Sequence, residues 1–295
     1  MKFSVVIPTF NRPASLPGCL EALAAVDYPK DEYEVIVADD GSDDPLDGIV
    51  APFRNRMEVS LARLPHRGLA ATRNSGMAAA RGRYVLFIDD DCRCAPNWLR
   101  AFSRCFEETP DAMIGGKWVN GLPGNIYCEL QQGILDAVLA WYNSDSKLAK
   151  FVPGGNLGVP AALYKEIGGC DESFPPCGGE DRDLCARWLE HGYVIRSVSE
   201  AVVFHKHHLS MRSFLRTYYF YGRGARAYHL RRASRGARWP QLGMYADLRN
   251  LLSPIARAQG LGRKFGIAGL MIAWQLANLT GYVSEWWRPS GSGTQ

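Results

Sequence analysis

Three consecutive carboxylates end an apolar segment of this 295-residue chain. The segment is YVLFI at residues 84–88, and the acids are Asp89, Asp90 and Asp91. Two carboxylates about 5 Å apart repel by roughly 3 kcal/mol at an effective dielectric of about 20, so the cluster destabilises a fold unless a cation lies beside it. Oxygen ligands suit Mg²⁺ or Mn²⁺, which complete their coordination with water and phosphate oxygens. The cluster therefore predicts a divalent cation that carries a diphosphate.

A second acidic pair, Asp39 and Asp40, follows the apolar run VIVA and precedes Gly41 and Ser42. An Asx-type turn explains such a stretch without any function. A carboxylate at the end of a strand can also accept the ring N–H of a nucleobase. Because the Asp89–Asp91 cluster ends another predicted strand, we expect the two acidic sites to meet, and we favour a nucleotide site.

A third acidic pair, Glu180 and Asp181, follows two glycines in the stretch GGEDRDLCARW. Acids at the start of a helix are favoured by the helix dipole, which is the structural alternative. The pair also follows the glycine-rich stretch VPGGNLGVP at residues 152–160, and that spacing suits catalytic acid–base work. We favour the catalytic interpretation.

Residues 4–118 alternate short β-branched runs with amphipathic stretches. The predicted strands are 4–8, 33–39, 58–64 and 83–89, and the predicted helices are 16–26, 69–82 and 96–108. This alternation is typical of an α/β fold with a Rossmann-like, mostly parallel sheet and helices on both faces. Ligands of such sheets bind at the carboxyl ends of the strands, where Thr9 and the first two acidic sites fall.

The rest of the chain is less regular. Residues 119–180 predict loops with one or two helices laid over the sheet edge, a suitable place for a second substrate. A helix over 180–193 and a strand over 193–208 follow, and then a C-terminal helical extension. We expect a catalytic domain at 1–208, divided into a nucleotide-binding half at 1–118 and an acceptor half at 119–208. The basic, aromatic helical region would then be 209–295.

Composition narrows the class and the compartment. The chain is 47% hydrophobic and carries a net charge of +4, with its arginines concentrated within residues 212–238. Its eight cysteines match no zinc-finger spacing, so we expect mostly reduced thiols in a cytoplasmic protein. The apolar run at the N-terminus ends at Pro8, which is too short for a signal-peptide core.

Five stretches, in this order, resemble the family-2 glycosyltransferases, which have the nucleotide-diphospho-sugar transferase fold, or A-type fold. They are SVVIPTFNR, VIVADDGSDD, GLAATRNSGMAAARGRYVLFIDDD, GGNLGVP and GGEDRDLCARW. The resemblance covers residues 3 to about 208, and the shared order makes it specific. It implies transfer of a sugar from a nucleotide-diphosphate donor, with a UDP-sugar favoured, to an acceptor hydroxyl with inversion of configuration.

The resemblance also implies roles for residues of this sequence. Asp89 and Asp91 would bind Mg²⁺ or Mn²⁺, with His205 completing the metal shell. The nucleotide-sugar pocket would include Pro8, Thr9, Phe10, Arg12, Asp40, Arg73 and Asp90, with Asp40 on the base, Asp90 on the ribose and Arg73 near the diphosphate. The catalytic pair would be Asp181, as general base, and Glu180. The acceptor or sugar pocket would be shaped by Gly154, Gly155 and Asn156.

The three neighbouring histidines have an alternative interpretation. His205, His207 and His208 could equally form a polar loop with structural hydrogen bonds. Position alone favours His205 over the other two as a metal ligand.

Residues 265–284 carry no charge, and Arg263 and Lys264 flank them. A helix on the membrane surface or a re-entrant helix, a membrane span, and ordinary helix packing are the three alternatives, and we favour the first because polar residues and glycines lower the hydrophobicity. With arginines and tyrosines upstream, we expect an anionic membrane surface as partner rather than nucleic acid. The protein would then lie at the cytoplasmic face of the membrane, peripheral or anchored, with a lipid-linked acceptor.

Two other classes compete with a glycosyltransferase. A sugar nucleotidyltransferase could share the sheet and the acidic cluster, but it needs a basic, glycine-rich phosphate loop after the first strand, and PTFNRPASL is not one. A non-catalytic, membrane-attached binding protein of the same fold is the other alternative. The presence of Asp89, Asp91 and Asp181 argues against it.

Overall fold

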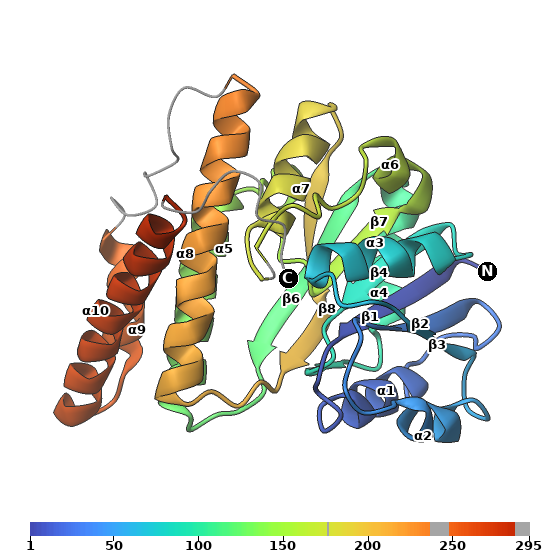
Figure 1. The fold of residues 1–295 in the computed structure, drawn as a ribbon, viewed down its shortest axis with the longest axis horizontal. Helices are drawn as coiled ribbons and strands as arrows, with labels where there is room; N and C mark the ends of the chain where they lie inside the picture. Colours follow the sequence, from blue (N-terminus) through green and yellow to red (C-terminus); the bar gives the residue numbers. More distant parts are fainter. Residues whose placement is uncertain (176, 237–247, 287–295) are drawn as a thin grey trace.

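The computed structural model describes residues 1–175, 177–236 and 248–286, which form a single sheet with helices around it (Figure 1). The sheet has eight strands in the order β3-β2-β1-β4-β7-β6-β8-β5. The strands are β1 (Phe3–Thr9), β2 (Tyr33–Asp39), β3 (Val59–Arg63), β4 (Tyr84–Ile88), β5 (Cys92–Cys94), β6 (Met113–Asn120), β7 (Asn156–Pro160) and β8 (Ile195–His205). The α-helices are α1 (Leu16–Ala24), α2 (Asp47–Val50), α3 (Leu69–Ala79), α4 (Trp98–Glu108), α5 (Ile126–Tyr142), α6 (Ala161–Glu166), α7 (Glu180–Glu190), α8 (Met211–Ser234), α9 (Leu248–Arg257) and α10 (Leu261–Ser284), and the 3₁₀ helices are η1 (Ala51–Phe53) and η2 (Ser146–Leu148).

Most neighbouring strands run parallel, as the sequence predicts. β3, β2, β1 and β4 are parallel to one another, and β6 is parallel to β8. β7 is antiparallel to β4 and to β6, and the short β5 is antiparallel to β8. Thr9 pairs with Asp39 at the ends of β1 and β2, and Asp89 follows the last residue of β4. The predicted α/β fold is therefore confirmed, and Thr9 and the first two acidic sites share one sheet edge.

Alternate residues of the central strands point to opposite faces of the sheet, which explains why these strands are apolar throughout. Val5 and Val35 pack on the face covered by α1, α2 and α4. Val6 and Ile36 pack on the face covered by α3, α6 and α7. Helices thus cover both faces, as expected.

Two inner strands, β6 and β7, are not among the predicted strands, and β7 lies where the sequence predicts loops and helices. Their sequences, MIGGKWVN and NLGVP, contain glycines that interrupt the apolar alternation. Gly158 illustrates the reason for these glycines, since a β-carbon there would lie 2.5 Å from a methyl of Leu86 and 2.9 Å from the ring of Phe102. The glycine is needed for close packing of the sheet against α4. Because it has no side chain, it also interrupts the apolar pattern by which a strand is recognised in a sequence.

The C-terminal helical extension is confirmed and joins α5 in a third apolar cluster. Figure 1 shows α5, α8, α9 and α10 gathered at one end of the molecule, away from β2 and β3. Tyr218 of α8 contacts Trp274 of α10 with ring centroids 5.8 Å apart, and both pack with Leu130 of α5. Among the residues that the structure describes, no helix combines the length and the hydropathy of a membrane span.

α8 and α10 touch through their backbones. A β-carbon on Gly222 would lie 1.9 Å from the carbonyl oxygen of Asn278, and one on Gly281 would lie 1.9 Å from the carbonyl oxygen of Tyr219. Such a distance to a backbone atom leaves no room for a side chain. The two glycines therefore fix how closely the helices approach.

We predict that Gly281→Ala forces the two helices apart and lowers the free energy of unfolding by about 1–3 kcal/mol, the usual cost of overpacking. Gly269→Ala in the same helix is the matched control, because among the described residues no packing neighbour lies within 4 Å of the added β-carbon. It should leave stability unchanged or raise it, since alanine favours a helix by about 1 kcal/mol over glycine. Urea denaturation followed by circular dichroism measures both, and equal midpoints for the two variants would contradict this account of the contact.

Candidate active site

Guanidinium groups compensate much of the charge at the end of β4. Arg12 Nη1 lies 2.9 Å from Asp90 Oδ1, and its Nη2 contacts Asp91. Thr9 donates a 2.7 Å hydrogen bond to Asp90 Oδ2. Burial disfavours a charge here, but Asp91 and Asp90 raise the pKa of the Arg12 guanidinium above its usual value. The cation that the acidic cluster requires is thus supplied partly by the protein itself.

Two histidines at the end of β8 face the same cluster. His205 Nε2 lies 3.3 Å from Asp91 Oδ1, and His207 Nδ1 lies 3.4 Å from Asp91 Oδ2. Burial alone would raise the pKa of Asp91, but His205 and Arg12 hold it well below its usual range. Burial lowers the pKa of His207 to about 4, so its imidazole is neutral at neutral pH, as a metal ligand must be.

The side chains of Asp91, His205 and His207 can act together as metal ligands. One ligand atom from each of the three lies within 4.8 Å of the others. The structure thus brings together two predicted ligands, Asp91 and His205, and adds His207, which was not predicted as a ligand. Asp89, also predicted as a ligand, lies outside this group, with its carboxylate 3.4 Å from Arg73.

Arg73 and Glu180 form a buried ion pair beside Asp89. Arg73 Nη1 lies 2.7 Å from Glu180 Oε1, and both side chains are buried. Although burial opposes the charge, Glu180 and Asp89 raise the pKa of Arg73. Breaking such a pair leaves a buried charge without compensation, so Glu180 has a structural role as the partner of Arg73.

Asp181 is held differently from its neighbour Glu180. Its Oδ2 accepts a 3.3 Å hydrogen bond from the backbone N–H of Gly154, and its Oδ1 accepts one of 2.8 Å from the N–H of Arg182. It is half-buried and lines the main cavity. Of the predicted acid pair, Asp181 is thus the member with no cationic side chain on its carboxylate among the described residues.

The glycine-rich loop before β7 allows close approach of two charged side chains. A β-carbon on Gly154 would lie 2.8 Å from the Arg73 guanidinium, and one on Gly155 would lie 2.2 Å from Asp89 Oδ2. Asn156 lies elsewhere: its Oδ1 accepts from the indole of Trp98 and its Nδ2 donates to two backbone carbonyls. Gly154 and Gly155 line the cavity, whereas Asn156 joins strands.

At the end of β2 the two acids are used unequally. Both oxygens of Asp40 accept backbone N–H groups, from Arg67 at 2.9 Å and Gly68 at 3.0 Å. Asp39 Oδ1 accepts from the N–H of Ser42 at 2.9 Å, whereas its Oδ2 is buried with no hydrogen-bond partner among the described residues. The carboxylate oxygen without a hydrogen bond at this strand end therefore belongs to Asp39, with Nε of Arg63 4.0 Å from it, rather than to Asp40, the residue that the resemblance implied.

A cavity of about 300 Å³ is lined on one part by Asp89 and the Glu180–Asp181 pair and on another by the C-terminal helices. The charged and imidazole side chains in its lining are Arg73, Asp89, Glu180, Asp181, Arg182, His205 and His207. α8 contributes Tyr218 and Tyr221 to the lining, and α10 contributes Trp274 and Asn278. Sequence reasoning missed these contributions, because only the tertiary packing of distant helices brings them to the acids.

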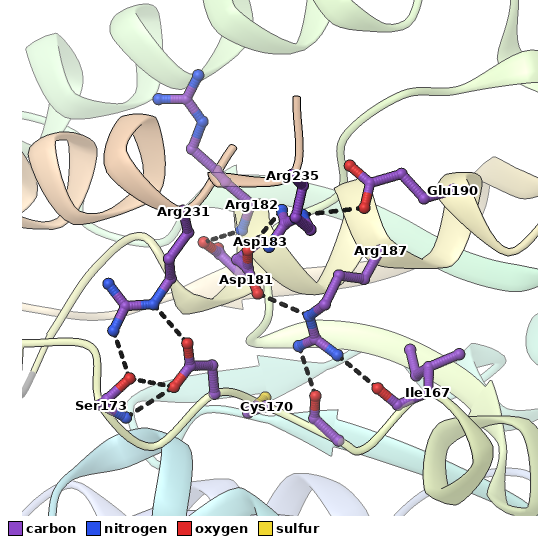
Figure 2. Close-up of polar contacts among 12 residues, drawn as sticks. Ile167, Cys170, Ser173, Asp181, Arg182, Asp183, Arg187, Glu190, Arg231 and Arg235 are labelled. Atoms are coloured by element: carbon purple, nitrogen blue, oxygen red, sulfur yellow. Dashed lines mark hydrogen bonds and ion pairs between the residues drawn. The ribbon is translucent and has the colours of Figure 1, made fainter. Parts of the chain in front are cut away.

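Ion pairs anchor α7, the helix that begins with Glu180 and Asp181, to the end of α8 (Figure 2). The buried Asp183 lies 2.7 Å from Arg187 Nε and 2.8 Å from Arg235 Nη2. Arg235 also lies 3.0 Å from Glu190, and Arg187 donates to the carbonyl oxygens of Ile167 and Gly169. The helix that presents Asp181 is thus fixed at both its start and its end.

Protein-family models and related proteins match most of the chain. A family model for glycosyl transferase family 2 matches residues 4–164, and a model for the N-terminal domain of galactosyltransferase matches residues 134–209. The pre-mycofactocin glycosyltransferase of Mycobacterium tuberculosis is 28% identical over 233 residues, 75% of this chain and 46% of that protein. Glycosyltransferase AglE of Haloferax volcanii is 27% identical over 208 residues, 68% of this chain and 66% of that protein. The chain spans less than half the length of the first of these relatives.

Solved structures share the fold. The mannosyltransferase PcManGT from Pyrobaculum calidifontis, in complex with GDP-mannose and Mn²⁺, gives a TM-score of 0.71 at 18% identity and covers 97% of this chain and 87% of its own. Residues 1–349 of S. aureus TarS, in complex with UDP-GlcNAc, give 0.52 at 19% identity and cover 96% and 89%. At these identities the likeness concerns the fold alone.

We predict that Arg187→Ala lowers the free energy of unfolding by about 3 kcal/mol, because it leaves the buried Asp183 with one cation fewer and two carbonyl oxygens without their donor. Arg56→Ala removes an ion pair with Glu21 in which both side chains are about half exposed, and it should cost less than about 1 kcal/mol. Urea denaturation of the two variants tests the difference. If Arg187→Ala were no more costly than Arg56→Ala, the network would not anchor α7.

Proposed function

The chain belongs to glycosyl transferase family 2, and from that premise we propose that it transfers a sugar from a nucleotide-diphosphate donor to an acceptor hydroxyl, with inversion of configuration. One observation carries the proposal. Asp181 lines the same cavity as His205 and His207, which together with Asp91 can hold a metal ion. A proton acceptor and a site for a leaving diphosphate are therefore available on either side of one space.

We propose that the donor nucleotide lies along the ends of β1 and β2. Asp39 Oδ2 is the free buried acceptor for a ring N–H, and Pro8, Thr9 and Phe10 are the neighbouring end of β1. A UDP-sugar is the favoured donor. TarS of Staphylococcus aureus, a poly(ribitol-phosphate) β-N-acetylglucosaminyltransferase, is 40% identical over 125 residues and its solved structure holds UDP.

Asp91, His205 and His207 would hold a divalent cation, and the ligand atoms that they offer indicate which ion is preferred. Two imidazole nitrogens beside one carboxylate favour Mn²⁺ over Mg²⁺, because imidazole suits transition metals and Mg²⁺ prefers oxygen. When bound, such an ion stabilises the charge that develops on a leaving diphosphate. Arg12 lies against Asp90 and Asp91 and would add a second positive group there.

Asp181 is proposed as the general base. Its carboxylate, fixed by the N–H groups of Gly154 and Arg182, would take the proton of the acceptor hydroxyl as that oxygen attacks the anomeric carbon. The bond to the diphosphate breaks on the opposite side of the carbon, so configuration inverts without a covalent enzyme intermediate. Glu180 acts by holding Arg73 and takes no proton in this scheme.

The outer face of α10 supports the proposed membrane partner. Exposed apolar side chains, here named the α10 stripe, recur at helical spacing on one side of the helix: Leu261, Phe265, Ile272, Leu276 and Leu279. Lys264 is exposed at the edge of the stripe. An apolar face with basic neighbours is typical of helices that lie in an anionic membrane surface, and we propose that the α10 stripe does so at the cytoplasmic face.

The function is tested by assaying a panel of UDP- and GDP-sugars for release of nucleoside diphosphate, with Mn²⁺ and with chelator. We expect one donor to react and chelator to stop the reaction. Asp181→Asn should lower kcat at least ~100-fold while nucleotide affinity is kept, as for loss of a general base. Asp111→Asn, the same change at an exposed position, should have no effect. Full turnover in Asp181→Asn would exclude the proposed base.

The membrane proposal predicts binding to vesicles that contain phosphatidylglycerol, measured by co-sedimentation. Leu276→Glu should lower that binding by about 10-fold, because it buries a charge in place of an apolar side chain. Leu148→Glu changes an equally exposed leucine outside the α10 stripe and is the control. Equal losses in both variants, or no vesicle binding by the unaltered chain, would contradict the proposal.

A further inference from the structure

The main cavity has two unlike walls. One carries the charged groups described above. The other, here named the helical wall, comes from α5, α8 and α10 and includes Ile134, Leu135, Val138, Tyr218, Trp274 and Asn278, with Gln131 and Gln132 of α5 beside them. Most side chains of the helical wall are apolar or aromatic. Among the described residues of α10, none places a charged side chain in the cavity lining.

Two tryptophans of the cavity lining have indole N–H groups without a hydrogen-bond partner among the described residues. Nε1 of Trp118 and Nε1 of Trp274 are buried, and neither has an acceptor among the described residues. Both side chains line the cavity, and Trp274 is only 3% exposed. An unpaired buried donor is unfavourable, so each indole is suited to a ligand that brings an oxygen acceptor into the cavity.

The two arginines in the described lining are already engaged. Both Nη atoms of Arg73 face carboxylates, those of Glu180 and Asp89. Arg182 donates a 2.6 Å hydrogen bond to the hydroxyl of Tyr142, and its guanidinium lies over the rings of Tyr142 and Tyr228. A phosphate group that entered here would meet the carboxylates of the other wall, and of the described lining guanidinium groups only Nε of Arg73, buried without a hydrogen-bond partner, would be left to pair with it.

We propose that the helical wall is the acceptor subsite, and that the acceptor is an uncharged alcohol whose body is an aromatic or aliphatic ring system. The indoles of Trp274 and Trp118 donate to oxygen atoms of this acceptor, and Ile134 and Leu135 contact its apolar surface. The inference rests on the proposed function and names its second substrate. It differs from a lipid-linked diphosphate, which would place anionic groups in this space.

The geometry gives a balanced transfer. The acceptor oxygen forms a bond to the anomeric carbon of the donor, and the bond from that carbon to the diphosphate oxygen breaks. The hydroxyl proton moves to the carboxylate of Asp181, and the bonding electrons leave with the nucleoside diphosphate. The helical wall orients the acceptor hydroxyl, and its side chains contribute no charge to the reaction.

The test is isothermal titration of the full chain with three probes: phenyl β-glucopyranoside, methyl β-glucopyranoside and the 6-phosphate of phenyl β-glucopyranoside. We expect the phenyl glucoside to bind at least ~10-fold more tightly than either of the others, because only it buries a ring without a phosphate. Tighter binding of the 6-phosphate would overturn the inference and favour a phosphorylated acceptor. Undetectable binding of the phenyl glucoside would overturn it as well.

Two variants assign the binding to the helical wall. Trp274→Phe keeps the aromatic surface but removes the N–H, and should weaken phenyl glucoside binding about 5- to 10-fold. Trp141→Phe makes the same change at an exposed tryptophan of α5 outside the lining and should have no effect. Leu135→Trp fills the cavity and should abolish binding. Equal affinities in Trp274→Phe and Trp141→Phe would contradict the assignment.

A separate titration with UDP and GDP keeps the two proposals distinguishable. If neither nucleotide binds while the phenyl glucoside does, the proposed function fails and the cavity assignment stands. If a nucleotide binds and the phenyl glucoside does not, the acceptor inference alone fails.

Discussion

Compensation of negative charge at the end of β4 is the constraint on which the site depends. Asp89, Asp90 and Asp91 follow one buried strand; Asp89 meets Arg73, Asp90 meets Arg12, and Asp91 meets Arg12 and two histidines. Each partner comes from another element of the fold. Among the described residues, Asp91 is the one of the three that belongs to a group of side chains able to hold a metal ion. Burial raises the pKa of Asp90 to about 7, which shows how strongly this position disfavours an uncompensated charge.

The C-terminal helices belong to this arrangement through direct contacts. Gly224 of α8 approaches the backbone of Gly178 and Gly179, the two glycines that lead into α7. A β-carbon on Gly224 would lie 2.0 Å from the carbonyl oxygen of Gly178. Because α8 in turn packs against α10 through glycines, the position of Asp181 depends on helices that follow it by tens of residues. The same helices supply the apolar wall of the cavity.

The sequence predicted the scaffold better than the contacts within it. The alternation of short apolar runs with amphipathic stretches identified β1, β2 and β4. The expected parallel sheet then placed Asp39, Asp40 and Asp89–Asp91 at one edge. The glycines of β6 and β7 leave space for neighbouring segments. Because glycine has no apolar side chain, these strands lack the apolar pattern by which a strand is recognised in a sequence. The partnership of Arg12 with Asp91 spans 79 residues, and the difference in hydrogen bonding between Asp39 and Asp40 depends on which oxygen meets a backbone N–H. Neither feature follows from the spacing of these residues in the sequence. His207 lies beside Asp91 because of the path that the chain takes after β8.

The central claim is that Asp91, His205 and His207 form one ligand set for a cation that meets the donor diphosphate. Pulsed electron paramagnetic resonance of Mn²⁺ bound to the full chain with UDP measures this most directly, because nitrogen couplings report imidazole ligands. The account predicts couplings from two imidazoles, one lost in His205→Ala and the other in His207→Ala. Bound Mn²⁺ with no imidazole coupling, in the presence of bound UDP, would contradict it.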